Sequence, residues 1–351
     1  ALVVDAALLV QRTAEGDPLS YERIRMAKRG AGALGDSRLI PGIILDQRVA
    51  LDRQARNLEQ VKVAVLTRPL ALQKGVRETE IEVNDVDQLE SFMAAEDALL
   101  DAHAQAVLTS GARLIVCAKE VEPRVLHRLV DAGCVVLADV ERDGAEDLAE
   151  VTGATLCEHL DDLTGECLGS LDRFSVETLE GDEGRRERLI FEHANSRLAC
   201  IDVGGSAGTA TEEVIRGLFD ALRSVIGAMD SGRLLLGGGS LHISAASAVR
   251  EAAEAATGRR RLAMDAFARA LEAVPGALIE NAGANRLDVL LDLRAAHRAG
   301  RSNEGVTVAG ANGVIEHAWA NAETLEHAIE VATEAVCGLL RIDQVISARG
   351  D

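Results

Sequence analysis

Short apolar runs alternate with amphipathic segments through the middle of the chain. The runs at 114–117, 135–137 and 154–156 carry no charge, and the segments 122–132 and 144–151 between them have apolar residues at helical spacing. Short apolar strands that alternate with helices are typical of a parallel sheet covered by helices. The sequence therefore predicts an α/β region with a parallel-type sheet.

The segments on either side of this region follow the same two periodicities. Helices are predicted at 2–11 and 87–109, and strands are predicted at 22–28, 41–46, 61–67, 188–191 and 197–203. The glycine-rich stretch 30–36 is a candidate hinge, and the acidic stretch 177–187 is predicted to be mobile.

From residue 211 onward the apolar spacing is helical only. The predicted helices, separated by glycine-containing breaks, are 211–229, 241–256, 261–273, 287–299 and 325–340. An α/β region followed by a mainly α-helical region implies at least two domains. The length of 351 residues agrees with roughly two to three domains.

The chain carries 57 acidic and 37 basic side chains, for a formal net charge of −20. This charge repels a phosphate backbone, and only 2% of the residues are aromatic, so a nucleic-acid partner is not expected. No apolar run reaches the roughly 18 residues that cross a bilayer, so a membrane partner is not expected either. We expect a soluble, cytoplasmic protein.

Lysine is scarce among the basic residues and occurs only at positions 28, 62, 74 and 119. An acid excess with few lysines suits a protein that stays soluble in concentrated salt, where screening removes self-repulsion. The cytoplasm of an archaeal halophile is one interpretation, and an ordinary acidic composition is the other.

The six cysteines show neither a Cys-x-x-Cys pair nor a histidine at ligand spacing. They are Cys117, Cys134, Cys157, Cys167, Cys200 and Cys337. Several lie inside apolar strands, so we predict buried, reduced thiols and no metal site.

Gly204-Gly205-Ser206 ends a predicted strand and precedes a helix with Glu212 and Glu213 in its first turn. Carboxylates in a first turn are favoured by the helix dipole, which is the ordinary reason for them. The alternative is that one carboxylate faces a water molecule or a metal-bound phosphate. The residues alone leave both interpretations open.

A second motif, Gly237-Gly238-Gly239-Ser240, lies between the apolar run 234–236 and a predicted helix. Three glycines let the backbone approach a ligand closely, and a helix N-terminus favours an anion. The motif lacks the Gly-Lys-Ser/Thr of a phosphate loop, so a simple turn fits these residues equally well.

Taken in order, several blocks of the sequence resemble the group II chaperonins, which include the archaeal thermosome. The most specific are 204–213 with Asp220-Ala221-Leu222, 230–239, and Glu280-Asn281-Ala282-Gly283 with Asp288. Supporting blocks are 4–6, 40–46, 147–154, 332–336 and 340–346. The resemblance covers essentially the whole chain.

The resemblance implies a chaperonin-like three-domain architecture. Residues 1–38 would be the first pass of the intermediate domain, and 39–202 the apical, substrate-binding domain. The chain would return through the intermediate domain at 203–232, and 233–351 would be the C-terminal part of a mainly helical equatorial domain.

The resemblance also implies a function, which is ATP-dependent folding of unfolded protein clients in a ring of sister subunits. Gly237, Gly238 and Gly239 would contact ATP, Glu212 would be the catalytic carboxylate that orients the attacking water, and Mg would accompany the nucleotide. Phe92 and Met93 would contact clients from a lid helix, although periodicity alone favours a core position. A shortened loop after Trp319 leaves the role of Glu323 open.

One family motif is absent, because Gly-Asp-Gly-Thr-Thr occurs nowhere in the sequence. This phosphate loop would belong to an N-terminal part of the equatorial domain that lies before Ala1. The alternative function is therefore an ATPase-inactive truncated relative that holds clients passively, or an incomplete fragment. A small-molecule enzyme is disfavoured, because no nucleophile, metal or dinucleotide motif is present.

Overall fold

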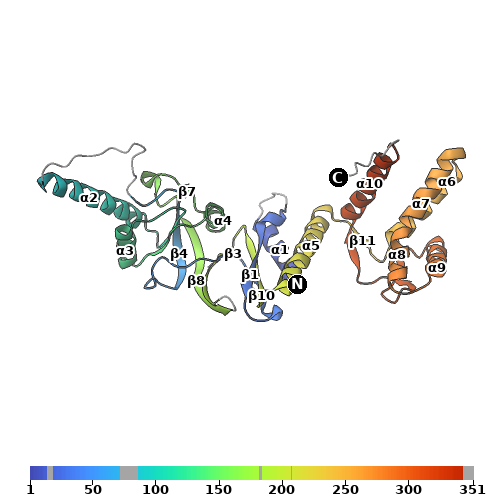
Figure 1. Cartoon of the computed structure of the whole chain (residues 1–351), viewed down its shortest axis with the longest axis horizontal. Helices are drawn as coiled ribbons and strands as arrows, with labels where there is room; N and C mark the ends of the chain where they lie inside the picture. Colours follow the sequence, from blue (N-terminus) through green and yellow to red (C-terminus); the bar gives the residue numbers. More distant parts are fainter. Residues whose placement is uncertain (14–18, 72–85, 182–183, 207, 343–351) are drawn as a thin grey trace, which may run out of the picture. The chain divides into compact units, whose positions relative to one another are not determined.

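The computed structural model describes residues 1–13, 19–71, 86–181, 184–206 and 208–342 (Figure 1). The chain divides into two compact units, Ala1–Arg223 and Ser224–Asp351. The division at 38, 202 and 232 into intermediate, apical and equatorial segments remains a prediction. No helix in the described ranges has both the length and the apolar character needed to cross a membrane.

The larger sheet of the first unit has seven strands. Their order is β3-β9-β8-β4-β5-β6, and β7 also pairs with β4. The bounds are β3 Gly42–Leu45, β9 Gly184–Glu192, β8 Gly169–Gly181, β4 Asn57–Leu66, β5 Leu114–Cys117, β6 Val135–Leu137 and β7 Leu156–Cys157. Strands β4, β5, β6 and β7 run parallel, as predicted, whereas β8 pairs antiparallel with both β4 and β9, and β3 pairs antiparallel with β9. The α/β prediction is confirmed, and the sheet as a whole is mixed.

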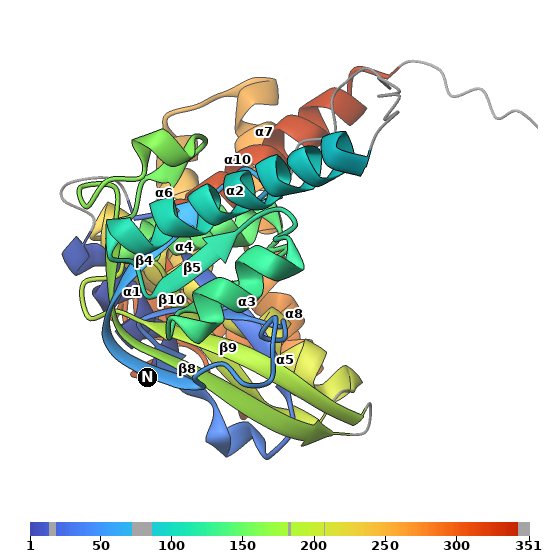
Figure 2. The ribbon, with the colours of Figure 1, turned by 90° about the vertical axis from the view of Figure 1, so that its left-hand side faces the viewer.

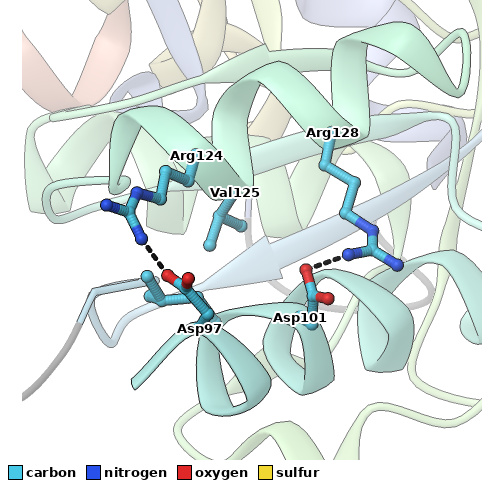
Figure 3. A pocket seen from close by; sticks show the side chains of 6 residues that line it. Asp97, Asp101, Arg124, Val125 and Arg128 are labelled. Carbon is cyan, nitrogen blue, oxygen red and sulfur yellow. Dashed lines mark hydrogen bonds and ion pairs between the residues drawn. The ribbon is translucent and has the colours of Figure 1, made fainter. Parts of the chain in front are cut away.

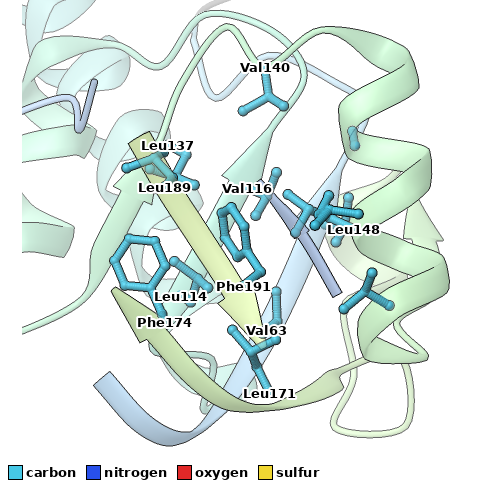
Figure 4. Packing of buried hydrophobic residues seen from close by; sticks show 14 of the residues in the cluster. Val63, Leu114, Val116, Leu137, Val140, Leu148, Leu171, Phe174, Leu189 and Phe191 are labelled. Carbon is cyan, nitrogen blue, oxygen red and sulfur yellow. The ribbon is translucent and has the colours of Figure 1, made fainter. Parts of the chain in front are cut away.

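Helices cover both faces of this sheet. Successive residues of β4 and β5 point to opposite sides, so these strands contribute buried apolar side chains to a cluster on each face. Val63 and Val116 pack with Leu148 of α4 (Arg142–Thr152), in a cluster that also contains the rings of Phe174 and Phe191 at 5.3 Å between centroids (Figure 4). The other face packs against α2 (Val86–Ser110) and α3 (Pro123–Asp131) (Figure 2).

The acidic stretch 177–187, predicted to be mobile, forms strand structure at 177–181 and 184–187 as part of the β8–β9 hairpin. Glu177 lies opposite Arg188 and Glu180 lies opposite Arg185 in the register. Opposite charges directly across an antiparallel pair stabilise it. The charge density therefore reflects cross-strand pairing and not a lack of structure.

A second, three-stranded sheet of the first unit has the order β1-β10-β2, with β1 Ile24–Gly30, β10 Ala199–Ser206 and β2 Arg38–Ile40. Helix α1 (Leu2–Thr13) buries one apolar face, in line with its prediction, and packs against β10. Strand β10 continues through Gly204 and Gly205, three residues beyond the predicted end at 203.

A buried ionic cluster joins the two sheets. Arg188 of β9 and Asp202 of β10 are both fully buried, and the Arg188 Nη2 donates to Asp202 Oδ1 at 2.7 Å. Arg38 of β2 donates through Nε to the other Asp202 oxygen at 3.1 Å and through Nη2 to Glu177 at 2.9 Å. Asp46 lies 3.3 Å from Arg188 Nε. Since buried charges need partners, this cluster fixes β9 against β10.

The second unit is mainly helical, as predicted. Its described elements are β11 Leu234–Leu236, α6 Ser240–Glu254, α7 Gly258–Leu271, α8 Ala273–Asn281, α9 Arg286–Arg298, β12 Glu304–Val306, β13 Asn312–Val314, β14 Trp319–Asn321 and α10 Ala322–Leu339. A break between two helices was expected at Pro275-Gly276, but both residues lie in α8. Pro275 is in the first turn, where its missing N–H leaves no helical hydrogen bond unmade.

Glu272, between α7 and α8, anchors three helices of this unit. Its carboxylate is almost completely buried and accepts hydrogen bonds from Arg250 Nη1 of α6 at 2.6 Å and from Arg294 Nε of α9 at 2.7 Å. Burial raises the pKa of this carboxyl, but the hydrogen bonds from Arg294 and Arg250 outweigh it, so the pKa is lowered.

All six cysteines are free thiols. Cys117, Cys134, Cys157 and Cys200 are buried and Cys167 is half-buried, whereas Cys337 is exposed. The prediction of a buried thiol is wrong for Cys337, because the last turns of α10 lie at the surface, where Val336 and Leu340 are exposed as well.

Candidate functional site

Glu212 lies in the first turn of α5 (Thr209–Ser231). The turn is held by Thr211, whose hydroxyl donates to the Ser206 carbonyl oxygen at 2.7 Å. The glycines before it are required by close contacts, because a Cβ on Gly204 would lie 2.2 Å from the Ala33 oxygen and one on Gly205 would lie 2.7 Å from Thr211 Oγ1. The double glycine therefore lets the end of β10 lie close to Ala33 and to Thr211, in the first turn of the helix that carries Glu212.

The Glu212 side chain is 63% exposed and forms an ion pair with Lys28 of β1, with 3.2 Å between Nζ and Oε1. Glu213 instead pairs with Arg216 along the helix surface, at 3.2 Å. The two carboxylates thus differ, since Glu212 faces the three-stranded sheet and Glu213 serves its own helix. Lys28 was not singled out from the sequence, where only its membership of a set of four lysines distinguished it.

The glycine turn 237–239 connects β11 to α6. Gly238 and Gly239 have left-handed backbone angles, with φ of 63° and 74°. A Cβ would lie 3.1 Å from the Ala318 Cβ at Gly237, 2.8 Å from the Val306 oxygen at Gly238, and 2.7 Å from the Pro275 Cβ at Gly239. Gly238 and Gly239 are therefore required by close contacts and by their backbone angles, whereas a Cβ at Gly237 would fit tightly against Ala318.

The same turn keeps donors available at the start of α6. Gly237 N–H donates to the Ala318 oxygen at 2.8 Å and Ser240 N–H donates to the Gly237 oxygen at 3.2 Å. Within the described ranges, no hydrogen bond uses the N–H groups of Gly238 and Gly239. Free N–H groups beside a helix N-terminus fit an anionic or polar ligand.

A metal ion bound to phosphate needs oxygen ligands, usually from carboxylates. In the described part of the chain, no group of three His, Cys, Asp or Glu side chains is arranged to hold a metal ion. The free N–H groups of the glycine turn are compatible with a polar or anionic ligand, and contacts with ATP and Mg remain predictions. Glu212 belongs to the first unit and the glycine turn to the second.

Phe92 and Met93 lie on the N-terminal half of α2 and are 43% and 50% exposed. This exposure excludes the core position that periodicity alone favoured. Leu99, two turns further along, is also exposed, whereas Leu100 and Val107 are buried against the sheet. Helix α2 is therefore anchored by its C-terminal half and presents apolar side chains from the other half.

Two ion pairs clamp the middle of α2 to α3. Asp97 pairs with Arg124 and Asp101 pairs with Arg128, each residue one helical turn from the next on its own helix (Figure 3). The four side chains line a pocket with Val125 between them. This ladder fixes the point at which α2 leaves the α/β body.

Comparison with known proteins identifies the family to which this sequence is related. The sequence profile of the TCP-1/cpn60 chaperonin family matches residues 1–350. The chain belongs to this family.

Among relatives of this chaperonin-family chain is a thermosome subunit alpha of Archaeoglobus fulgidus, 32% identical over 363 residues, with 100% of this chain and 64% of the relative covered. A thermosome subunit of Methanopyrus kandleri is 30% identical, covering 99% and 64%, and thermosome subunit 3 of Haloferax volcanii is 33% identical, covering 97% and 66%. The chain thus spans about 64% of the length of the first two relatives.

The solved structures include an open-state monomer of a group II chaperonin from Methanococcoides burtonii. It matches with a TM-score of 0.64 and 26% identity, covering 97% of this chain and 79% of that chain. The resemblance to group II chaperonins and the chaperonin-like fold are thus confirmed.

Glu323 has a defined place in this chaperonin fold. It lies in the first turn of α10, where its N–H donates to the capping side chain of Asn321 at 3.2 Å. A carboxylate at this position is favoured by the helix dipole. The structure thus gives Glu323 a role in starting α10, and a nucleotide contact remains a prediction.

Proposed function

We propose that this chain is a chaperonin-subunit-like protein that binds unfolded proteins and assists their ATP-dependent folding in a ring with sister subunits. The observation that carries the proposal is the family match over residues 1–350. The thermosome-subunit relatives, which match almost the whole chain, support it as well. The cytoplasmic location expected from the composition is part of the same proposal.

The client surface in this proposal is the N-terminal half of α2. Unfolded proteins expose apolar side chains, and Phe92 and Met93 offer exposed apolar side chains on a helix that packs against the sheet through Leu100 and Val107 further along. Met adapts to irregular apolar partners, which suits clients without a common sequence.

The nucleotide surface in this proposal is the glycine turn, whose N–H groups at Gly238 and Gly239 would contact ATP. ATP would supply the free energy of phosphoryl transfer that drives a folding cycle. Glu212 is the carboxylate proposed to orient water, and its pairing with Lys28 holds the side chain on one side of α5. Mg would accompany the nucleotide, and no residue is assigned to it, because no group of three candidate ligands comes together within the described ranges.

The client proposal is tested with the full chain and denatured citrate synthase, whose aggregation on dilution is followed by light scattering. The chain should suppress aggregation, and the double variant F92S/M93S should suppress it several-fold less, because the apolar contact is lost. Val308→Ser is the matched control, since Val308 is a fully exposed apolar residue of the other unit and should leave suppression unchanged. Equal suppression by F92S/M93S and the unmodified chain would overturn the assignment to α2.

The ATPase proposal is tested separately by phosphate release from ATP. Glu212→Gln should lower the rate at least tenfold, because water loses its orienting carboxylate, and Glu213→Gln should leave it unchanged. Client suppression by a chain that releases no phosphate would support the passive client holder instead. Phosphate release that survives Glu212→Gln would remove Glu212 from the mechanism.

A further inference from the structure

Two cysteines of the first unit form hydrogen bonds with the same residue, Thr155. Cys157 ends β7, and Cys167 lies where the chain returns before β8. The Thr155 N–H donates to the Cys167 carbonyl oxygen at 3.0 Å, and the Cys157 thiol donates to the Thr155 carbonyl oxygen at 3.5 Å. Cys157 is buried in the apolar cluster against which Cys167 packs, and Leu160 and Leu163 from the segment between the two cysteines belong to the same cluster.

The two thiols differ in access to solvent. Cys157 is buried, and desolvation followed by the adjacent Cys167 raises its pKa to about 11. Cys167 is half-buried, and its sulfur contacts the Asp162 carbonyl oxygen at 3.2 Å and the Thr164 hydroxyl at 3.7 Å. An oxidant from solvent therefore reaches Cys167 more readily than the buried Cys157.

We propose that Cys157 and Cys167 are a redox-responsive pair that a hydroperoxide converts into an intramolecular disulfide. The Cys167 sulfur attacks one peroxide oxygen, the O–O bond breaks, and the thiol becomes a sulfenic acid while the hydroperoxide is reduced to the alcohol or water. The Cys157 sulfur then attacks the sulfenic sulfur, the S–O bond breaks, and the hydroxyl leaves as water with the Cys157 proton. In total, two thiols lose two electrons and two protons to one hydroperoxide.

The disulfide would close the loop 158–166 at its base. This loop contains the short helix Leu160–Asp162, and Leu160 and Leu163 pack in the same cluster as Leu100 and Val107 of α2. Closing a loop removes conformational freedom from the chain. Oxidation would therefore stiffen the support on which the C-terminal half of α2 rests, whatever α2 binds.

The test uses the full chain with Cys337→Ser, which removes the exposed thiol and with it cross-links between molecules. After treatment with hydrogen peroxide, peptide mapping without reduction should find the Cys157 and Cys167 peptides joined and lighter by the mass of two hydrogen atoms. Dithiothreitol should separate them again. Adding Cys134→Ser to this background is the control and should leave the linked peptides unchanged, because the Cys134 thiol donates to the Ala112 carbonyl oxygen at 3.6 Å and, in the described chain, makes no hydrogen bond with Thr155.

Adding Cys157→Ala to the same background isolates the first step. Cys167 should then remain a sulfenic acid that dimedone labels, since its resolving thiol is gone. The proposal is overturned if Cys167 of the chain with both thiols proceeds to a sulfinic acid while Cys157 stays free for alkylation. It is also overturned if neither thiol reacts, or if Cys157 is found linked to another cysteine; none of these readouts depends on client binding or ATP.

Discussion

At the scale of single residues, Glu272 combines burial with two cationic partners. A carboxylate removed from water is costly unless its charge and its lone pairs are satisfied. Arg250 and Arg294 satisfy both oxygens of Glu272 and come from helices on either side of it. One side chain thus decides how α6, α9 and the α7–α8 corner meet.

Glu272→Gln should lower the free energy of unfolding of the second unit by about 2–3 kcal/mol, because two guanidinium groups lose their counter-charge. This is less than the full penalty of a completely buried pair, since both arginines reach solvent. Urea unfolding followed by circular dichroism measures the change. Glu326→Gln, which breaks a surface pair with Arg233, is the control and should have little effect.

The same group predicts a pH dependence. The pKa of Glu272 is lower in the folded chain than its ordinary value of 4.5, so folding is favoured by the ionised form. Its contribution is fully present above about pH 4.5 and is lost as the pH falls through the folded-state pKa. Acid unfolding of Glu272→Gln should therefore lack this part of the pH dependence, and an identical acid profile would contradict the assignment.

At the scale of elements, the ladder between α2 and α3 predicts a local effect. Asp97→Asn with Asp101→Asn should remove two exposed ion pairs, worth together about 1 kcal/mol, and speed amide exchange in α2 roughly fivefold. Hydrogen exchange with mass spectrometry reads this directly, and Glu96→Gln on the same helix is the control. Unchanged exchange in the double variant would show that apolar packing alone anchors α2.

Prediction of helices and strands from the sequence succeeded where burial within one segment sets the spacing of its apolar residues. The strand 135–137 has the predicted bounds because all three residues are buried, and α1 was found from its single apolar stripe. Residues 188–191 of β9 were predicted as a strand, whereas β8 and the start of β9 were missed, because their pairing involves charge pairs such as Glu177 and Arg188, and pairing across strands is not visible along one segment. Helix α8 was missed because Pro275 breaks a helix only beyond its first turn.

The candidate site was predictable in part for a similar reason. Glu212 and the three glycines follow from local order along the chain, and the structure places them at a helix start and a turn as expected. Lys28 was not predictable, because it comes from a strand far away in the sequence. The packing partners of the glycine turn, Ala318 and Pro275, were likewise not predictable, because they are distant from the turn in the sequence.

At the scale of the whole molecule, the net charge of −20 opposes the folded state through self-repulsion. Salt shortens the Debye length from about 10 Å at 0.1 M to about 3 Å at 1 M. The urea midpoint of the full chain should therefore rise between 0.1 and about 1 M KCl. Repeating the series near the sequence pI of about 4.9 is the control, because the salt effect should shrink when the net charge is small. A urea midpoint that falls with KCl at pH 7 would argue against an adaptation to salt.

The glycine turn 237–239 has a consequence for how related chains diverge. A side chain at Gly238 or Gly239 would collide with Val306 or Pro275, and one at Gly237 would press against Ala318, so selection for a folded second unit favours all three glycines. Glu212 has no such constraint, because it is exposed and touches only Lys28 among its charged neighbours in the described chain. Under the role proposed for Glu212, a lineage that abandoned ATP hydrolysis would keep the glycines and drift at Glu212, so the carboxylate would be the more informative of the two positions.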